Sequence, residues 1–471
     1  QKRWKNLRKQ FAKNFGKKYT PNANAGMAAS FLSMALAKVK PGGRIGYVLP
    51  LTAASDTSWQ KTRSMIEQEF EDILVITGKK GRVSDETAIN EMLLVATRRT
   101  KPKPKANLGS PVYCVNIKET PDSLGVAGEM ARAISPALSE LEGSKRSIRM
   151  GKSEIGHVLR FEGKEGKPWS HARIKDTDLA LISTRLVEEG LLQDFETREE
   201  ISLPCPIRRI EKIFKVGPTE SIIGHVDESK RIRGAFRFVP LLDEEPYGYD
   251  RSLWSADSKH KNTLIVHPTH KGESYSLKNK KGMLVSTESH RNAIRKSIST
   301  CFYAQYMGWA SQKLLIASTH MKVMGGRAWT SLSHADDRVL RMMSLWGNSI
   351  LGMLINWTQG SRTQSGRFMT RIKGIRQMPC PDFSQLSEEA LNLAEQRFKA
   401  LSQLELMPAA QCHADQNRHK IDEAVIEILA LPAEQMRGIV KKLRWTFCAE
   451  DSVHGGNKAC LNLLEKAERP S

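Results

Sequence analysis

The chain has 471 residues, of which 40% are hydrophobic and 26% charged, a balance typical of a globular protein and not of a disordered one. No apolar run approaches the ~18 residues that a transmembrane helix requires, and no segment reads as a secretory signal, so we expect no membrane partner and a cytoplasmic location. The formal net charge of +22 at pH 7 favours a polyanionic partner that binds through phosphates. We interpret this partner as nucleic acid; the alternative interpretations of the charge alone are an RNA- or membrane-surface-binding protein and a merely basic surface.

The first eighteen residues form a basic arm, and the first acidic residue of the chain is Asp56. We expect its charges to contact nucleic-acid phosphates. The interleaved Trp4, Phe11 and Phe15 fit packing on a sheet better than stacking on an extruded base. A solvated amphipathic helix is the alternative. The candidate DNA-binding residues in the arm are Lys2, Arg3, Lys5, Arg8 and Lys9.

The stretch Met27–Arg99 predicts the second half of a Rossmann-like α/β sheet. A helix ends at Gly42 and Gly43, and the unbroken apolar run that follows is typical of a strand buried on both faces of a parallel sheet. A second helix, a second strand, a basic loop and a third strand come next. The three strands are predicted at Ile45–Leu49, Ile73–Ile76 and Met92–Ala96.

Residues 101–144 read as a Lys- and Pro-rich linker and a helix over Ser123–Leu141, with a strand at Pro111–Ile117 between them. Residues 145–340 show short apolar runs between polar turns, which predicts a mixed α/β domain. Within it, Arg327 and Trp329 follow two glycines. This segment fits a DNA contact and a tight turn with a core tryptophan equally well.

Residues 341–471 are predicted to be helical, apart from one loop. An apolar helix over Leu345–Trp357 leads into a Gly- and Arg-rich loop at Gln359–Lys373, which we interpret as a DNA contact, with an ordinary solvated loop as the alternative. A later helix places Asp415, Arg418 and Asp422 on its polar side, where ion pairing suffices to explain them. The loop residues assigned to DNA are Arg362, Gln364, Arg367 and Arg371.

The seven cysteines include no Cys-x-x-Cys pair, and their odd number argues against a disulfide framework. Cys448, His454 and Cys460 do not match a usual zinc spacing. We therefore predict no metal site.

Several motifs carry a family resemblance. The order FLxxALxxxKPGGRIGYVLP, then ILVI, then VSDETAINEMLLVATRR resembles the second half of the N6-adenine DNA methyltransferase domain of large single-chain restriction-modification and phage-defence enzymes. RTQSGR, MPCPDF and RHKIDEAVIEILALP resemble the segments that follow the recognition region in these enzymes. The resemblance implies S-adenosylmethionine (AdoMet) as methyl donor and a flipped adenine as substrate in the complete enzyme. It also implies that residues 145–340 are the target-recognition domain.

The motifs that hold AdoMet and catalyse transfer in that family are not seen here: there is no Pro-Pro dipeptide and no glycine fingerprint after a strand. We therefore expect a C-terminal portion of such an enzyme, inactive alone, with no catalytic or AdoMet-binding residue. Val83 and Ser84 occupy the position where the family often places an aromatic residue against the flipped base, and we expect them in the target-base pocket.

The sequence therefore predicts residues 1–100 as the C-terminal half of the methyltransferase domain, 101–144 as linker and helix, 145–340 as recognition domain and 341–471 as helical region. Expected partners are double-stranded DNA and either the missing half or a separate subunit. The alternatives are a non-catalytic DNA-specificity or defence subunit that docks on a separate methyltransferase, and a fragment of an RNA-modifying enzyme.

Overall fold

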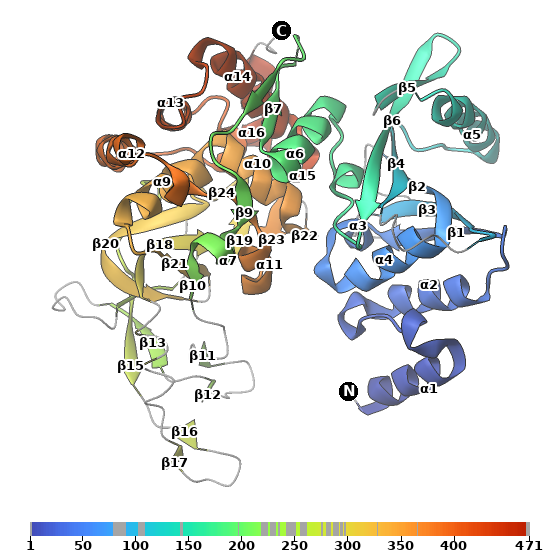
Figure 1. Cartoon of the computed structure of the whole chain (residues 1–471), viewed down its shortest axis with the longest axis horizontal. Helices are drawn as coiled ribbons and strands as arrows, with labels where there is room; N and C mark the ends of the chain where they lie inside the picture. Colours follow the sequence, from blue (N-terminus) through green and yellow to red (C-terminus); the bar gives the residue numbers. More distant parts are fainter. Residues whose placement is uncertain are drawn as a thin grey trace. The chain divides into compact units, whose positions relative to one another are not determined.

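The computed structural model describes residues 2–78, 91–101, 109–141, 145–195, 197–217, 225–226, 232–233, 236–241, 251–254, 261–274, 277–278, 284–285, 292, 295, 298–326, 328–364 and 366–467. They belong to two compact units, Gln1–Leu181 and Ile182–Ser471, drawn in Figure 1. In these residues no helix is long and apolar enough to span a bilayer.

The first unit is built on a six-stranded mixed sheet with the order β1-β3-β2-β4-β6-β5. Strand β3 lies antiparallel between β1 and β2, so β1 and β2 run in the same direction, and β4 is parallel to β2. The sheet thus confirms a mixed α/β class. Its strands are β1 (Arg44–Pro50), β2 (Phe70–Gly78), β3 (Glu91–Arg98), β4 (Gly109–Ile117), β5 (Lys145–Met150) and β6 (Ser153–Lys164).

Strand β1 differs from its prediction as a doubly buried strand of a parallel sheet. Its described neighbour is the antiparallel β3. Ile45 and Leu49 are buried, but the side chain of Val48 between them is 51% exposed. The physical reason is that β1 is the outermost described strand and its buried side chains alternate, as expected when one face is covered.

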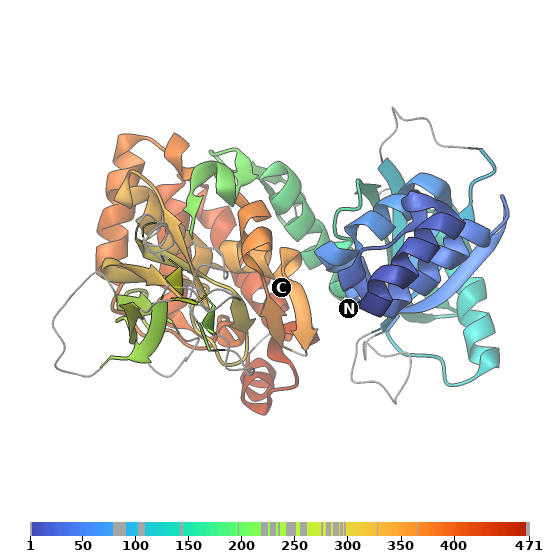
Figure 2. The ribbon, with the colours of Figure 1, turned by 90° about the horizontal axis from the view of Figure 1, so that it is seen from below.

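Helices cover both faces of this sheet (Figure 2). Leu74 and Ile76 of β2 pack with α5, while the alternating Ile73 and Val75 are fully buried on the opposite side, where α2 and α4 lie against β1 and β2. Lys61 at the start of α4 donates to Lys17 O, at 2.8 Å, which fixes the end of α1. The helices are α1 (Lys2–Tyr19), α2 (Gly26–Lys38), α3 (Thr52–Ser55), α4 (Gln60–Glu69) and α5 (Leu124–Ser139).

Two buried charged residues of α4 fasten the segment after β6. Arg63 donates to the carbonyls of Gly166 (2.9 Å) and Lys167 (3.0 Å). Glu67 accepts from the Gly166 amide (2.8 Å) and from Trp169 Nε1 (2.9 Å). Burial lowers the pKa of Arg63 to about 10, despite the carboxylates of Glu67 and Asp56. These bonds attach the segment after β6 to α4. The first unit accordingly contains β4 to β6 and continues to Leu181, whereas the sequence predicted a domain boundary at residue 144.

The second unit contains a seven-stranded sheet with the order β10-β21-β18-β20-β14-β15-β13. Leu264–Val266, one of the short apolar runs from which strands are predicted in residues 145–340, makes only an isolated bridge, Ile265 to Ser318. The strands of this sheet are β10 (Lys215–Val216), β13 (Phe236–Pro240), β14 (Arg251–Leu253), β15 (His270–Ser274), β18 (Ser299–Ala304), β20 (Ile316–Gly325) and β21 (Trp329–Ser333). The shorter strands are β7 (Leu191–Gln193), β8 (Glu200–Ser202), β9 (Ile207–Arg209), β11 (His225–Val226), β12 (Ile232–Arg233), β16 (Leu277–Lys278), β17 (Leu284–Val285), β19 (Tyr306–Gly308), β22 (Ser361–Gln364), β23 (Arg367–Met369) and β24 (Pro379–Pro381).

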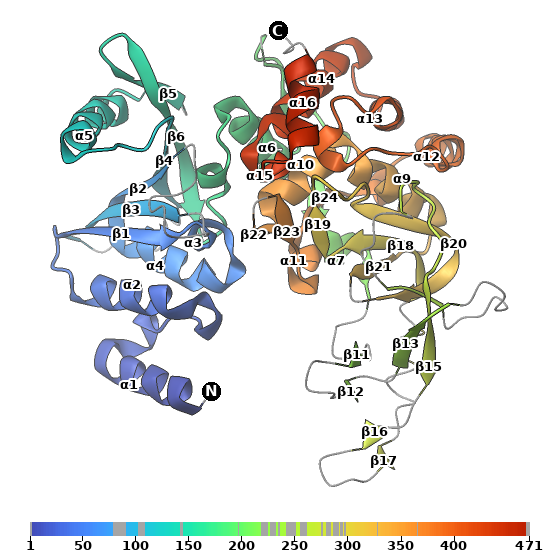
Figure 3. The ribbon, with the colours of Figure 1, turned by 180° about the vertical axis from the view of Figure 1, so that it is seen from behind.

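The C-terminal part is helical from residue 388 onward, as predicted. Helices α12 and α13 contact α9, and α14 contacts α10 (Figure 3). Helix α6 (Thr177–Glu189) runs across the boundary of the two units. The remaining helices are α7 (Ile210–Ile213), α9 (Asp337–Asn348), α10 (Ile350–Gln359), α11 (Ile372–Gln377), α12 (Glu388–Leu401), α13 (Gln416–Ile428), α14 (Ala433–Ala449), α15 (Asp451–His454) and α16 (Lys458–Lys466).

The apolar helix predicted over Leu345–Trp357 is in fact two helices that meet at Ser349. The break leaves backbone groups without helical partners, and α13 supplies those partners. Arg418 donates to Asn348 O (2.9 Å), and Asp422 accepts from the Ile350 amide (2.7 Å). Arg444 of α14 donates to Asp422 at 2.7 Å.

The sequence placed Arg418 and Asp422 on the polar side of their helix and explained them by ion pairing; the pairs form, with Asp415 and Arg444, but in the core. Both side chains are fully buried. A buried charge is tolerated only where it is paired and hydrogen-bonded, and the interrupted helix provides those bonds. We call Arg418, Asp422 and Arg444 the α13 charge network.

Replacing Asp422 with alanine should lower the free energy of unfolding by about 3–5 kcal/mol, because it leaves Arg444 and the Ile350 amide buried without a partner. Urea denaturation measures the loss. The matched control is Glu427→Ala on the same helix, which breaks the exposed pair with Arg397 and should cost at most about 1 kcal/mol. Equal small losses for both variants would show that the network does not support the fold.

Candidate nucleic-acid interface

The predicted loop at Gln359–Lys373 is a β-hairpin followed by a short helix. Strands β22 and β23 pair antiparallel, and β19 adds a third strand on the other side of β23. Gly366 makes the turn with a φ of +67°, a conformation that L side chains rarely adopt. Its carbonyl accepts from the Trp309 amide at 3.0 Å. The prediction of a loop missed the hairpin because its strands have only three and four residues.

An aromatic series anchors the hairpin to the helical region. Phe368 on β23 is buried and contacts Trp309 edge-on, with ring centroids 5.9 Å apart. Trp309 in turn contacts Phe447 of α14 (5.4 Å), which contacts Trp357 of α10 (5.5 Å). Because Phe368 points inward, the neighbouring Arg367 is exposed on the outer face.

The chain then leads directly into α11, which turns its apolar side inward. Ile372 and Ile375 are buried, and Arg371 and Lys373 are exposed. Arg376 is half-buried. The alternation places three cations of one short segment outside the core. Thr370 holds the start of this segment by donating its amide to Gln305 O at 2.8 Å.

A second basic segment, distant in the sequence, lies beside α11. Strand β9 pairs with β24, and the Ile210 amide donates to Met378 O at 2.9 Å, which places α7 next to α11 in Figures 1 and 3. Gln377 also donates to Glu211 at 2.6 Å. Arg209 and Lys212 are exposed on this second segment.

Together these side chains form what we call the α7–α11 cationic cluster. Within the described ranges, no ion pair takes up their charges, whereas the neighbouring Arg208 is paired with Asp382 at 3.3 Å. Cations at the surface are suited to phosphate contacts and not to proton transfer. The cluster consists of Arg209, Lys212, Arg371, Lys373 and Arg376.

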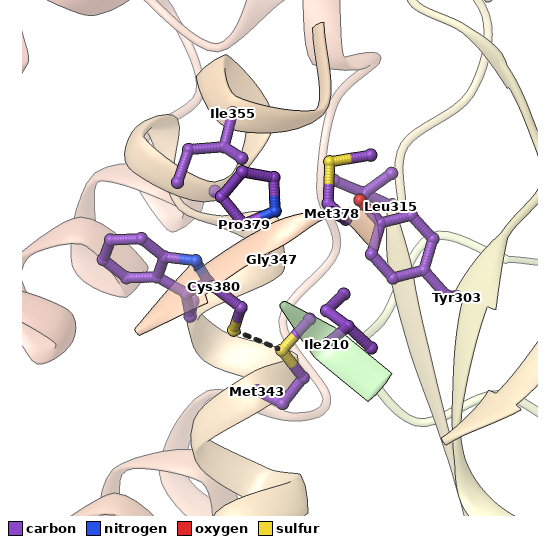
Figure 4. A pocket seen from close by; sticks show the side chains of 11 residues that line it. Ile210, Tyr303, Leu315, Met343, Gly347, Ile355, Met378, Pro379 and Cys380 are labelled. Carbon is purple, nitrogen blue, oxygen red and sulfur yellow. Dashed lines mark hydrogen bonds between the residues drawn. The ribbon is translucent and has the colours of Figure 1, made fainter. Parts of the chain in front are cut away.

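The small cavity behind this cluster is apolar (Figure 4). Its volume is about 10 Å³, and its lining includes Ile210, Met378 and Cys380. Its one hydroxyl, on Tyr303, accepts from Asn356 at 2.8 Å. The space is enough for a single water at most and holds neither a nucleobase nor AdoMet.

Of the residues assigned to DNA from the sequence, Arg371 belongs to this cluster and Arg367 is exposed on β23. The backbone of Arg362 and Gln364 forms β22, but their side chains lie outside the described set, as do those of Lys2, Arg3, Lys5 and Arg8 on α1. Lys9 is exposed. Arg327, Val83 and Ser84 lie outside the described residues. Of the two interpretations of Trp329, a DNA contact and a core residue, the structure supports the core residue, because Trp329 is buried in β21.

Sequence reasoning missed Arg209, Lys212 and Arg376, and it included Lys373 only as the last residue of the segment interpreted as a DNA contact. Lys373 and Arg376 carried a usable signal, since they alternate with the apolar Ile372 and Ile375 at helical spacing. Nothing in the sequence indicates that residues near 209 pair with residues near 379.

No protein-family model matches the chain, and no curated protein matches it. Among solved structures, the chain is similar to the type IIG restriction endonuclease BpuSI, with a TM-score of 0.39 and 10% sequence identity. The similarity covers 92% of this chain and 48% of BpuSI, so the chain spans about half the length of that enzyme.

Replacing Gly366 with alanine should destabilise the second unit by about 1–2 kcal/mol, because a β-carbon is disfavoured at positive φ. The ideal position of that carbon also lies 3.3 Å from Gly455 Cα. Thermal unfolding monitored by circular dichroism measures the effect. The control is Gly438→Ala on α14, where the added carbon has no neighbour within 4 Å and alanine favours the helix. A Gly366→Ala variant as stable as the wild type would show that the turn is not constrained.

Proposed function

We propose that this chain is the DNA-binding portion of an AdoMet-dependent adenine-N6 DNA methyltransferase of the restriction-modification or phage-defence type. The observation that carries the DNA part is the α7–α11 cationic cluster, where two segments far apart in the sequence present five cations on one surface. The +22 net charge of the chain supports the same partner. Double-stranded DNA offers a row of phosphates that such a surface neutralises, with release of counterions.

The methyltransferase part rests on the resemblance of the Met27–Arg99 stretch and of the C-terminal motifs to that family. The β1-β3-β2 arrangement is compatible with it, since the strand containing Met92–Ala96 lies beside the strand containing Ile45–Leu49. In this proposal Val83 and Ser84 line the target-base pocket, and the α1 arm and Arg362, Gln364, Arg367 and Arg371 contact DNA, together with Arg327.

The cavity of Figure 4 does not fit AdoMet, because it is far too small and its lining is mostly apolar. We therefore derive no methyl-transfer step from this chain, and we assign AdoMet binding to a part of the complete enzyme outside this sequence. This same observation keeps the second candidate open, a non-catalytic DNA-specificity subunit that docks on a separate methyltransferase.

The double variant Arg371→Ala/Lys373→Ala should weaken binding to duplex DNA and flatten its salt dependence. Two lost phosphate contacts lower the slope of log affinity against log salt by about 1.8. Fluorescence anisotropy across a salt series measures both quantities. The matched control is Arg437→Ala/Lys441→Ala, which removes the same charge from an exposed face of α14. If both double variants change the slope equally, net charge and not the cluster governs binding.

The enzymatic assignment is tested on the complete protein that contains this sequence. Incubation with DNA and methyl-labelled AdoMet should yield labelled N6-methyldeoxyadenosine after digestion to nucleosides. The Arg371→Ala/Lys373→Ala variant should lower the rate of methylation at limiting DNA and leave AdoMet binding, measured by calorimetry, unchanged. Label in cytosine would overturn the adenine assignment. DNA binding without any methylation would favour the specificity subunit.

A further inference from the structure

Two buried cysteines of the helical region lie in contact. Cys412 follows the short 3-10 turn Ala409–Gln411, and Cys448 lies in the last turn of α14. Their Sγ atoms are 3.3 Å apart, and both residues are fully buried. The two sulfurs of a disulfide are about 2.05 Å apart. A small movement of either side chain therefore brings the pair to bonding distance.

The charges around the pair favour a thiolate at Cys448. Burial acts to raise the pKa of this thiol, but the hydrogen bond with Cys412 and the neighbouring His413 outweigh it and lower the pKa to about 5. Burial lowers the pKa of His413, yet its interaction with Cys448 raises it overall. Arg418 and Arg444 also face Cys412, whose pKa is nevertheless raised well above its usual value, by burial first and then by Cys448. These interactions favour the thiolate at Cys448 over a thiolate at Cys412.

The other buried cysteines lack this arrangement. Burial raises the pKa of Cys114, Cys301 and Cys380. Cys380 donates to the Met343 sulfur, which cannot become an anion. Since the thiolate is the reactive form of cysteine, oxidation should select the Cys412–Cys448 pair.

Helix α16 lies against the turn before Cys412 and against α14. Of its nine residues only Cys460 is buried, and Gln411 donates to its sulfur at 3.6 Å. A helix that buries a single side chain opens at low cost in free energy. Its opening gives a molecule as small as a peroxide a path to the pair.

We propose that Cys412 and Cys448 are an oxidation site at which a hydroperoxide converts two thiols into a disulfide. The Cys448 thiolate attacks one peroxide oxygen, the O–O bond breaks, and the departing hydroxide takes a proton from His413, giving a Cys448 sulfenic acid and water. The Cys412 sulfur then attacks the Cys448 sulfur, the S–O bond breaks, and the hydroxyl leaves as water with the Cys412 proton. Two thiols lose two electrons, and hydrogen peroxide is reduced to two waters.

The bond would connect α14 to the segment that begins α13. Cys412 precedes Asp415, which caps α13, and Cys448 lies one turn after Arg444 of the α13 charge network. Oxidation therefore fixes the two helices that hold the α9–α10 break. This consequence is independent of the proposed methyltransferase function.

The test treats the full chain with hydrogen peroxide and counts free thiols after denaturation. The wild type should fall from seven thiols to five, and mass spectrometry of its peptides should show a Cys412–Cys448 link. The Cys460→Ser control should lose the same two thiols. In Cys412→Ser, a dimedone adduct should form at Cys448 with no intramolecular link. Loss of thiols elsewhere, or an intact pair at doses that modify the other cysteines, would overturn the proposal. The peptide map of the wild type requires no variant to fold.

The His413→Ala variant tests whether the Cys412–Cys448 pair is reactive or only adjacent. The wild-type rate of thiol loss should depend less on pH between 6 and 8 than that of an ordinary cysteine, because the pKa of Cys448 is lowered. In the variant the rate at pH 7 should fall about tenfold or more and rise with pH, as the pKa returns toward the usual ~8.5 of a cysteine. A rate that falls equally at every pH would mean that His413 acts only on packing.

Discussion

The second unit depends on how one break in a buried helix is satisfied. Between α9 and α10 the chain interrupts its helical hydrogen bonds at Ser349, deep in the core. A carbonyl and an amide left unpaired there would each cost about 1–3 kcal/mol. Arg418 and Asp422 bond these groups, and Arg444 balances the charge of Asp422. Four helices, α9, α10, α13 and α14, are thereby held together by directional bonds, whereas apolar packing alone would allow several arrangements.

The same break sets where the basic surface lies. Asn348, at the break, accepts from the Leu315 amide (2.9 Å) and donates to Ile316 O (2.7 Å), so the helix is tied to the start of β20. From there α10 runs to the β22–β23 hairpin and α11. Gly347 lies so close to Ile316 that a β-carbon would approach Ile316 Cγ1 to 2.1 Å. The position of the cations on α11 is thus a consequence of close packing far from them.

The first unit relies on a comparable device. Arg63 and Glu67, one turn apart on α4, hold the backbone of the segment after β6, where Gly166 has a φ of +69°. In both units a short helix carries buried charges to irregular backbone that no neighbouring strand or helix can satisfy. This arrangement explains how a helix side that is rich in acidic and basic residues in the sequence can face the core.

The sequence by itself determined the α/β class, the helical C-terminal region, the existence of β1 to β4 and the basic character of the 359–373 segment, because periodicity and turn residues act over a few positions. Only the tertiary structure decided that β3 lies antiparallel between β1 and β2, and that Arg209 and Lys212 join Arg371 and Lys373. It also decided that Arg418 and Asp422 are buried. These outcomes depend on which distant segments pair, and on whether a charge finds a partner inside the core. A local pattern reports charge and periodicity, but it carries no information about the groups that will face it after folding.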